Sequence, residues 1–128
     1  MTGDLVYVNA GHNPPYLVRK TGQMDVLDPT GPLVAPFRDA TFHDMQCHLD
    51  PDDLLVLFTD GVTEAGPESG ELFGEERLER VLQSSWSSPV ADVCQSVVRA
   101  ASDFTCGELP DDATVLVLRR TCQEKCLR

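Results

Sequence analysis

Acidic residues in this sequence flank two runs of apolar residues, and that placement could serve metal chemistry. Asp60 directly follows the run 54–59, and the pair Asp111 and Asp112 directly precedes the run 113–118. If the two runs form neighbouring antiparallel strands, the end of the first lies beside the start of the second. The carboxylates then converge at one edge of a sheet. Converging carboxylates repel one another, and a bound divalent cation removes that repulsion.

The residue types at this edge favour Mg²⁺ or Mn²⁺ over zinc, because the available ligands are carboxylate oxygens. The cysteines form no Cys-x-x-Cys pair, which argues against a zinc site and fits reduced cytoplasmic thiols. They are Cys47, Cys94, Cys106, Cys122 and Cys126. The alternative is that Asp60-Gly61 and the acidic pair after Pro110 are ordinary turns, as such dipeptides usually are. The residues alone leave both interpretations open.

The spacing of apolar residues predicts the elements that position these acids. Strands are predicted at 5–8, 16–18, 24–27, 41–49 and 54–58, arranged as an antiparallel meander, and a buried closing strand at 113–118. Helices are predicted at 75–85 and from Pro89 to about Phe104, with Ser88 as the N-cap of the second helix and Gly107 as its stop. Strands followed by two helices and a closing strand indicate an α+β fold rather than repeated βαβ units.

Composition limits the classes of partner. The 128 residues contain 10 basic and 21 acidic side chains, giving a net charge of −11, and are sufficient for one domain. Such a surface repels nucleic acid and anionic lipid, so neither is an expected partner. No apolar run is long enough to span a bilayer, and the first residues do not have the pattern of a signal peptide. These features predict a cytoplasmic protein without membrane contact.

Four motifs, in order, resemble the C-terminal part of the SpoIIE-type (stage II sporulation protein E) phosphatases, bacterial members of the metal-dependent phosphatase 2C-like class. The motifs are Asn9-Ala-Gly-His-Asn-Pro-Pro15, Phe58-Thr-Asp-Gly-Val-Thr-Glu-Ala65, Leu72-Phe-Gly-Glu-Glu-Arg-Leu78 and Asp111-Asp-Ala-Thr-Val-Leu-Val-Leu118. The resemblance implies a partial α-β-β-α sandwich made of antiparallel strands plus two helices. It assigns residues 1–120 to the C-terminal portion of the domain and 121–128 to a tail.

The same resemblance implies a protein serine/threonine phosphatase that uses two Mn²⁺ or Mg²⁺ ions and attacks phosphorus in line with water. It makes Asp60 and Asp111 the catalytic metal ligands and Asp112 a further ligand or outer-shell group. Gly61 would permit a tight turn beside the site. Asn9, Gly11 and His12 would form a supporting loop, in which His12 either orients a ligand or is simply solvated.

The implied substrate is a phosphorylated anti-sigma-factor antagonist, a small protein whose dephosphorylation releases a sigma factor. The family also has an upstream Asp-x-x-Gly-(Lys/His)-Gly segment whose aspartate bridges both metals, and no such segment occurs in these 128 residues. We therefore expect a truncated domain with little activity of its own and an exposed apolar edge that favours self-association. The alternative function is a catalytically silent module that binds a partner or regulates.

Overall fold

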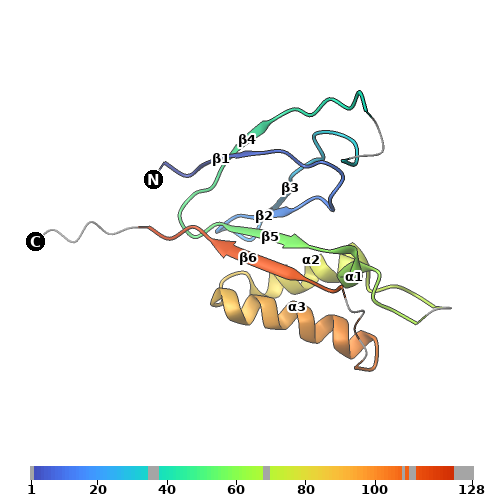
Figure 1. Cartoon of the computed structure of the whole chain (residues 1–128). Coiled ribbons are helices and arrows are strands. Elements are labelled where there is room, and N and C mark those ends of the chain that lie inside the picture. The colour runs from blue at the N-terminus through green and yellow to red at the C-terminus, as the bar shows by residue number, and fades with distance from the viewer. Residues whose placement is uncertain (1, 35–37, 68–69, 108, 110–111, 123–128) are drawn as a thin grey trace, which may run out of the picture.

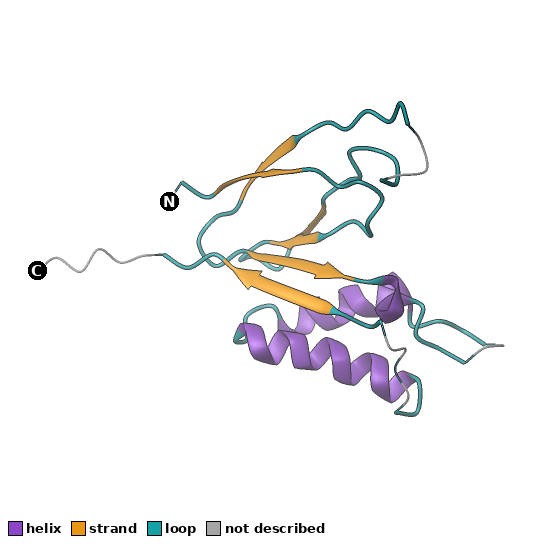
Figure 2. Cartoon of the chain, in the orientation of Figure 1, coloured by secondary structure: helices purple, strands orange, loops and turns teal. Residues whose placement is uncertain are grey.

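The computed structural model describes residues 2–34, 38–67, 70–107, 109 and 112–122, and these form three layers (Figure 1). A pair of long helices covers one face of a four-stranded sheet, and a two-stranded sheet lies over the other face (Figure 2). The strands are β1 (Asp4–Tyr7), β2 (Tyr16–Val18), β3 (Met24–Val26), β4 (Met45–His48), β5 (Leu54–Phe58) and β6 (Val115–Arg119). The helices are α1 (Asp60–Thr63), α2 (Gly74–Ser85) and α3 (Val90–Phe104). This is the α+β sandwich, with antiparallel strands, that the sequence predicts.

Strand β5 is one of the two inner strands of the four-stranded sheet, whose order is β3-β2-β5-β6 with every pair antiparallel. Its unbroken apolar sequence suits this position because both of its faces are covered. Leu54, Val56 and Phe58 belong to the core on the helical side, whereas Leu55 belongs to the smaller core beneath the two-stranded sheet. A strand held on both sides is a rigid base for the residues that follow it.

Helices α2 and α3 each bury one apolar stripe against the sheet. Leu78 and Leu82 of α2 are fully buried, as are Val93 and Val97 of α3. Burial of each such side chain stabilises the fold by about 1.5–3 kcal/mol. The spacing that predicted both helices is the spacing of these stripes. No helix among the described residues is long and apolar enough to cross a membrane.

The predicted meander is wrong. Strand β1 pairs with β4 rather than with its neighbour in sequence, so the two form a separate sheet. The segment after β3 brings the chain back beside β1. There, the Asn9 N–H donates to the Thr30 hydroxyl (2.8 Å), and the Thr30 N–H donates to the Asn9 carbonyl (2.9 Å). These are contacts across about twenty residues that local spacing does not reveal.

Two boundaries also differ from the predictions. Pro89 is the N-cap of α3, not its first helical residue, because its ψ of 145° is extended, and Ser88 therefore lies outside the helix. The tight turn predicted after Phe58 is instead the short helix α1, whose Val62 packs in the core on the helical side.

The closing strand β6 is not buried throughout, as its apolar sequence had suggested. It is the edge strand of the sheet, and only the face that bears Val117 packs against the helices. Leu116 and Leu118 point to the other face and are 50% and 49% exposed. These two side chains leave an apolar surface on that face of β6. Self-association through it stays a prediction.

Candidate metal site at the ends of β5 and β6

The pairing of β5 with β6 brings the two acidic segments to the same edge of the sheet. Phe58 is opposite Val115 in the antiparallel register, so the residues after Phe58 meet those before Val115. One further hydrogen bond extends the ladder, from the Thr59 N–H to the Thr114 carbonyl (3.0 Å). The predicted convergence is therefore present for Asp60 and Asp112. Asp111 lies outside the described residues.

Thr59 ties the acidic turn to the end of β5. Its hydroxyl donates to the carbonyl oxygen of Asp112 and accepts a hydrogen bond from the Thr114 N–H (2.9 Å). The hydroxyl thus uses its donor and an acceptor site on the same neighbouring segment. Thr59 belongs to one of the four motifs, but its role could not be predicted from the sequence. The available signal was a polar residue between a buried strand and an acid.

Gly61 allows the segment that contains Asp112 to approach α1 closely, whereas a tight turn was expected at this position. It lies within α1, and a Cβ atom added there would be 2.5 Å from Asp112 Oδ1 and 2.9 Å from the Ala113 nitrogen. The Asp112 carboxylate therefore lies against the α-carbon of Gly61, in space that any side chain would fill. The glycine of the Thr-Asp-Gly sequence is required because the two segments approach so closely.

The two described carboxylates at this edge are exposed to solvent. Asp60 begins α1, and its Oδ1 accepts a hydrogen bond from the Gly61 N–H (3.0 Å), which leaves lone pairs available on both oxygens. Asp112 is exposed as well. Their chemistry suits Mn²⁺ or Mg²⁺, which take oxygen ligands. Within the described residues, however, no group of three His, Cys, Asp or Glu side chains is placed to hold a metal ion.

The predicted supporting loop is built around Asn9, which is 5% exposed. Its side-chain Oδ1 accepts a hydrogen bond from the His12 N–H (2.8 Å), and its Nδ2 donates to the His12 carbonyl (3.0 Å). Gly11 has a φ of 90°, a left-handed conformation that glycine adopts without strain. The Asn9 side chain therefore fixes the turn that precedes the two prolines.

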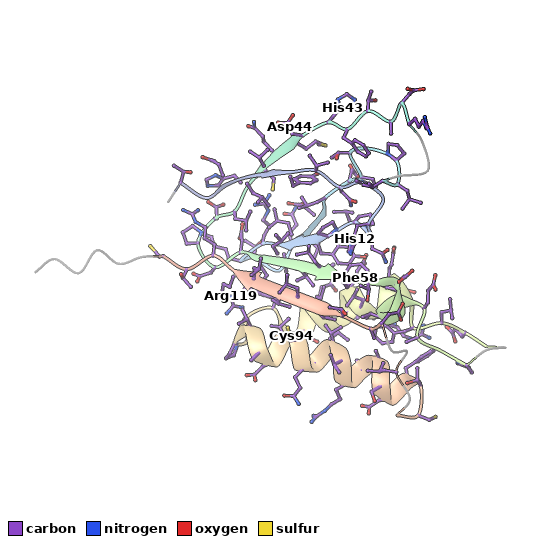
Figure 3. All side chains as sticks on the ribbon, viewed as in Figure 1. His12, His43, Asp44, Phe58, Cys94 and Arg119 are labelled. Carbon is purple, nitrogen blue, oxygen red and sulfur yellow. The ribbon has the colours of Figure 1, made fainter. Side chains whose placement is uncertain are left out.

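This loop lies at the same end of the sheet as Asp60, but within the part of the chain that the structure describes no hydrogen bond or ion pair joins the two. Strand β2 begins where the loop ends, and its Tyr16 ring stacks on Phe58 with centroids 5.4 Å apart. Figure 3 shows His12 and Phe58 toward one end of the molecule and Arg119 toward the other. The exposed His12 lines a mainly apolar cavity of about 190 Å³ with Asn9 and Leu55. The structure thus places the loop near the acidic edge without joining the two.

The chain is similar to known proteins in sequence and in fold. The sequence model of the stage II sporulation protein E (SpoIIE) family matches residues 1–121. The chain is 37% identical over 86 residues to the protein IcfG of Synechocystis, covering 67% of this chain and 14% of IcfG. It is 30% identical over 115 residues to the phosphoserine phosphatase RsbU of Bacillus subtilis, covering 89% of this chain and 34% of RsbU. It therefore spans at most about a third of these relatives.

Solved structures share the fold. The RsbU and RsbW domains of a Mycobacterium tuberculosis protein match with a TM-score of 0.79 at 24% identity, covering 94% of this chain and 33% of that one. The phosphatase domain of SpoIIE from Bacillus subtilis matches with a TM-score of 0.66 at 19% identity, covering 92% and 56%. At such identities the likeness shows a common fold.

Proposed function

The chain belongs to the stage II sporulation protein E family, and from that premise we propose that it serves the metal-dependent hydrolysis of phosphoserine or phosphothreonine on a protein. The observation that supports this most directly is the meeting of Asp60 and Asp112 at one edge of the sheet. Neither carboxylate is buried in an ion pair, and Gly61 leaves space for one of them. Both carboxylates are therefore open to a cation from solvent.

We propose that Asp60 and Asp111 are metal ligands, with Asp112 as a further ligand or a group that orients them. The Asp112 carboxylate occupies the open space beside the Gly61 α-carbon. The carboxylate oxygens of this edge are ligands that fit Mn²⁺ or Mg²⁺. When bound, such ions polarise the phosphoryl group and neutralise its charge. The donors supplied here are few for an ion that prefers six, so water or other oxygen ligands must complete the shell.

Two features of the chain itself would act on the substrate, namely the position of the turn that contains His12 and the negative charge of the surface. The Asn9 side chain holds the turn that contains His12, and this turn stands at the same end of the sheet as the carboxylates. The net charge of −11 opposes the approach of a phosphate dianion. The carboxylates therefore favour binding of the cation first and of the phosphorylated substrate second.

We propose a phosphorylated anti-sigma-factor antagonist as the substrate, with the reaction in the cytoplasm. Two relatives from Bacillus subtilis, RsbU and RsbP, are named phosphoserine phosphatases, which supports the phosphoserine class. Neither nucleic acid nor membrane suits the acidic surface as a partner. The substrate would meet the acidic edge through a phosphorylated segment that carries few further negative charges.

The test is phosphate release by the 128-residue chain from p-nitrophenyl phosphate and from a phosphoserine protein, with Mn²⁺ and with chelator. We expect slow turnover that needs Mn²⁺, because the chain contains no Asp-x-x-Gly-(Lys/His)-Gly aspartate to bridge two ions. Asp60→Ala should lower the rate at least about a hundredfold, equivalent to about 2.7 kcal/mol. The matched control is Asp44→Ala, an exposed aspartate that Figure 3 shows near β4.

Turnover that needs Mn²⁺ but is unchanged by Asp60→Ala would contradict the proposed ligand. Absence of both turnover and Mn²⁺ binding would favour the silent partner-binding module. The observation that favours this alternative is that no third metal-ligating side chain joins the two carboxylates among the described residues.

A further inference from the structure

We infer that Thr59 is a positioning residue whose hydroxyl sets the spacing between the carboxylates at the ends of β5 and β6. The inference rests on the proposed metal-dependent function and concerns the same edge of the sheet. Thr59 is followed directly by Asp60 and contacts the turn that carries Asp112. One side chain therefore connects the two segments that are proposed to hold the ion.

The contacts of Thr59 form a closed clasp, by which we mean its three hydrogen bonds to the segment 112–114. The backbone N–H of Thr59 donates to the Thr114 carbonyl (3.0 Å), and the Thr114 N–H donates to the Thr59 hydroxyl (2.9 Å). The hydroxyl in turn donates to the Asp112 carbonyl. The last bond joins Thr59 to Asp112, which lies before the first residue of β6, Val115. The clasp therefore fixes a turn that the strand ladder alone would leave loose.

The chemical requirement of the clasp is specific. The group at position 59 must donate one hydrogen bond and accept another at the same atom, which a hydroxyl does and a methyl group does not. Valine has nearly the shape of threonine but would leave the Thr114 N–H and the Asp112 carbonyl without these partners. Serine would keep both. This difference separates the hydroxyl's role from that of side-chain volume.

Gly61 makes the same turn sensitive to small displacements. The Asp112 carboxylate already lies against the Gly61 α-carbon, so it has little freedom to move toward α1. If the clasp is lost, the turn is free to move in the directions that Gly61 does not block, and we expect the spacing between Asp60 and Asp112 to change. Partners that orient metal ligands without touching the ion typically contribute 10–100-fold in metal affinity, about the range we expect here.

The experiment measures Mn²⁺ affinity by the electron paramagnetic resonance signal of free Mn²⁺, on the full 128-residue chain. Thr59→Val should weaken binding about tenfold or more, and Thr59→Ser should stay within about twofold of the wild type. Thr21→Val is the matched control, because the exposed Thr21 follows β2 at the opposite end of the sheet. Circular dichroism establishes that each variant is folded, and Thr59→Ala replaces Thr59→Val if valine prevents folding.

Thermal unfolding and exchange of the Thr114 amide hydrogen distinguish positioning from stabilisation alone. A role in stability alone predicts a lower melting temperature for Thr59→Val with unchanged Mn²⁺ affinity in the folded protein, and this result would overturn the inference. Faster exchange at Thr114 together with weaker Mn²⁺ binding, both restored by serine, would support it. If the wild type binds no Mn²⁺ that Asp60→Ala removes, the proposed function fails and the inference fails with it. If Asp60→Ala removes Mn²⁺ binding but Thr59→Val binds Mn²⁺ as tightly as the wild type, the inference fails and the proposed function stands.

Discussion

Strand β5 has an aspartate near each end, and the two are surrounded in opposite ways. Asp53, just before the strand, is 1% exposed and accepts hydrogen bonds from Arg19 (3.0 Å) and from the N–H groups of Lys20 (2.9 Å) and Asp50 (2.8 Å). Asp60, just after it, is exposed and accepts one bond from its neighbour Gly61. The Asp53 carboxylate is buried and hydrogen-bonded within the fold, whereas the Asp60 carboxylate is exposed and available to a ligand.

The electrostatics of Asp53 follow from this environment. Burial raises the pKa of its carboxyl, but the hydrogen bonds from Lys20 and Asp50 and the Arg19 guanidinium outweigh burial, so the net pKa is lowered. A buried charge of this kind stabilises the fold only while its partners remain. Strand β5 is therefore anchored by a buried charge at one end and presents an exposed charge at the other.

Removal of the anchor should have the largest effect on stability. Asp53→Ala leaves Arg19 and two backbone N–H groups without their acceptor, so we expect it to lower the free energy of unfolding by about 3 kcal/mol. Urea denaturation measures this change. Asp60→Ala, the same substitution at the other end, should change stability by less than about 0.5 kcal/mol. Equal losses at the two ends would show that Asp53 does not anchor the strand.

Gly61→Ala should have the next largest effect, and it is specific to the acidic end. The added Cβ would lie 2.5 Å from Asp112 Oδ1 and 2.9 Å from backbone atoms of Asp112 and Ala113, so the turn must move. We expect a loss of about 2 kcal/mol, typical of overpacking. Denaturation measures the loss. Gly107→Ala is not a suitable control because of its positive φ, so Ala65→Gly serves as the comparison for a change of one methyl group. Full stability of Gly61→Ala would show that the close approach is not real.

Asn9→Ala should cost about 1 kcal/mol, because the two hydrogen bonds between the Asn9 side chain and the His12 backbone are lost. The effect should appear in urea denaturation and as faster exchange of the His12 amide hydrogen. Asn13→Ala is the control within the same loop, since among the described residues the Asn13 side chain makes no such hydrogen bond and only its carbonyl contacts His12. An exchange rate at His12 that does not change would mean that another contact fixes the loop.

The Asp53 carboxylate should also make the free energy of unfolding depend on pH, which is a smaller effect. Since the pKa of Asp53 is lowered in the folded state, its contribution is complete above the unfolded pKa of about 4 and is lost as the pH falls through the lower folded value. Unfolding free energies between pH 6 and pH 3 should therefore fall less steeply for Asp53→Asn than for the wild type. Identical slopes would mean that Asp53 is not the group that titrates.

The sequence predicted most of the fold because local spacing carried the information. The apolar run of β5 and the stripes of α2 and α3 have unambiguous periods, and their bounds were nearly correct. The pairing of β1 with β4 was missed because it joins residues far apart in the sequence, such as Leu5 and Cys47, and local spacing does not reveal such partners. The exposed face of β6 was missed because an edge strand and a central strand can have the same apolar sequence.

The candidate site was predicted in outline and not in detail. Antiparallel pairing of the two apolar runs was enough to bring Asp60 beside the acidic pair, and the structure shows this for Asp112. The role of Thr59 could not be read from spacing, because its hydroxyl bonds to residues more than fifty positions away. The same holds for Gly61, whose need for space arises only once the two segments meet.

We propose that a divalent cation binds at the Asp60 end of β5 and not at the Asp53 end. Titration of the ¹⁵N-labelled chain with small amounts of Mn²⁺ tests it directly, since the ion broadens amide signals near its site. We predict that the signals of Gly61, Val62 and Ala113 broaden first, that those of Lys20 and Leu54 persist, and that Asp60→Ala removes the difference. Broadening that is equal at both ends, or unaffected by Asp60→Ala, would contradict the account.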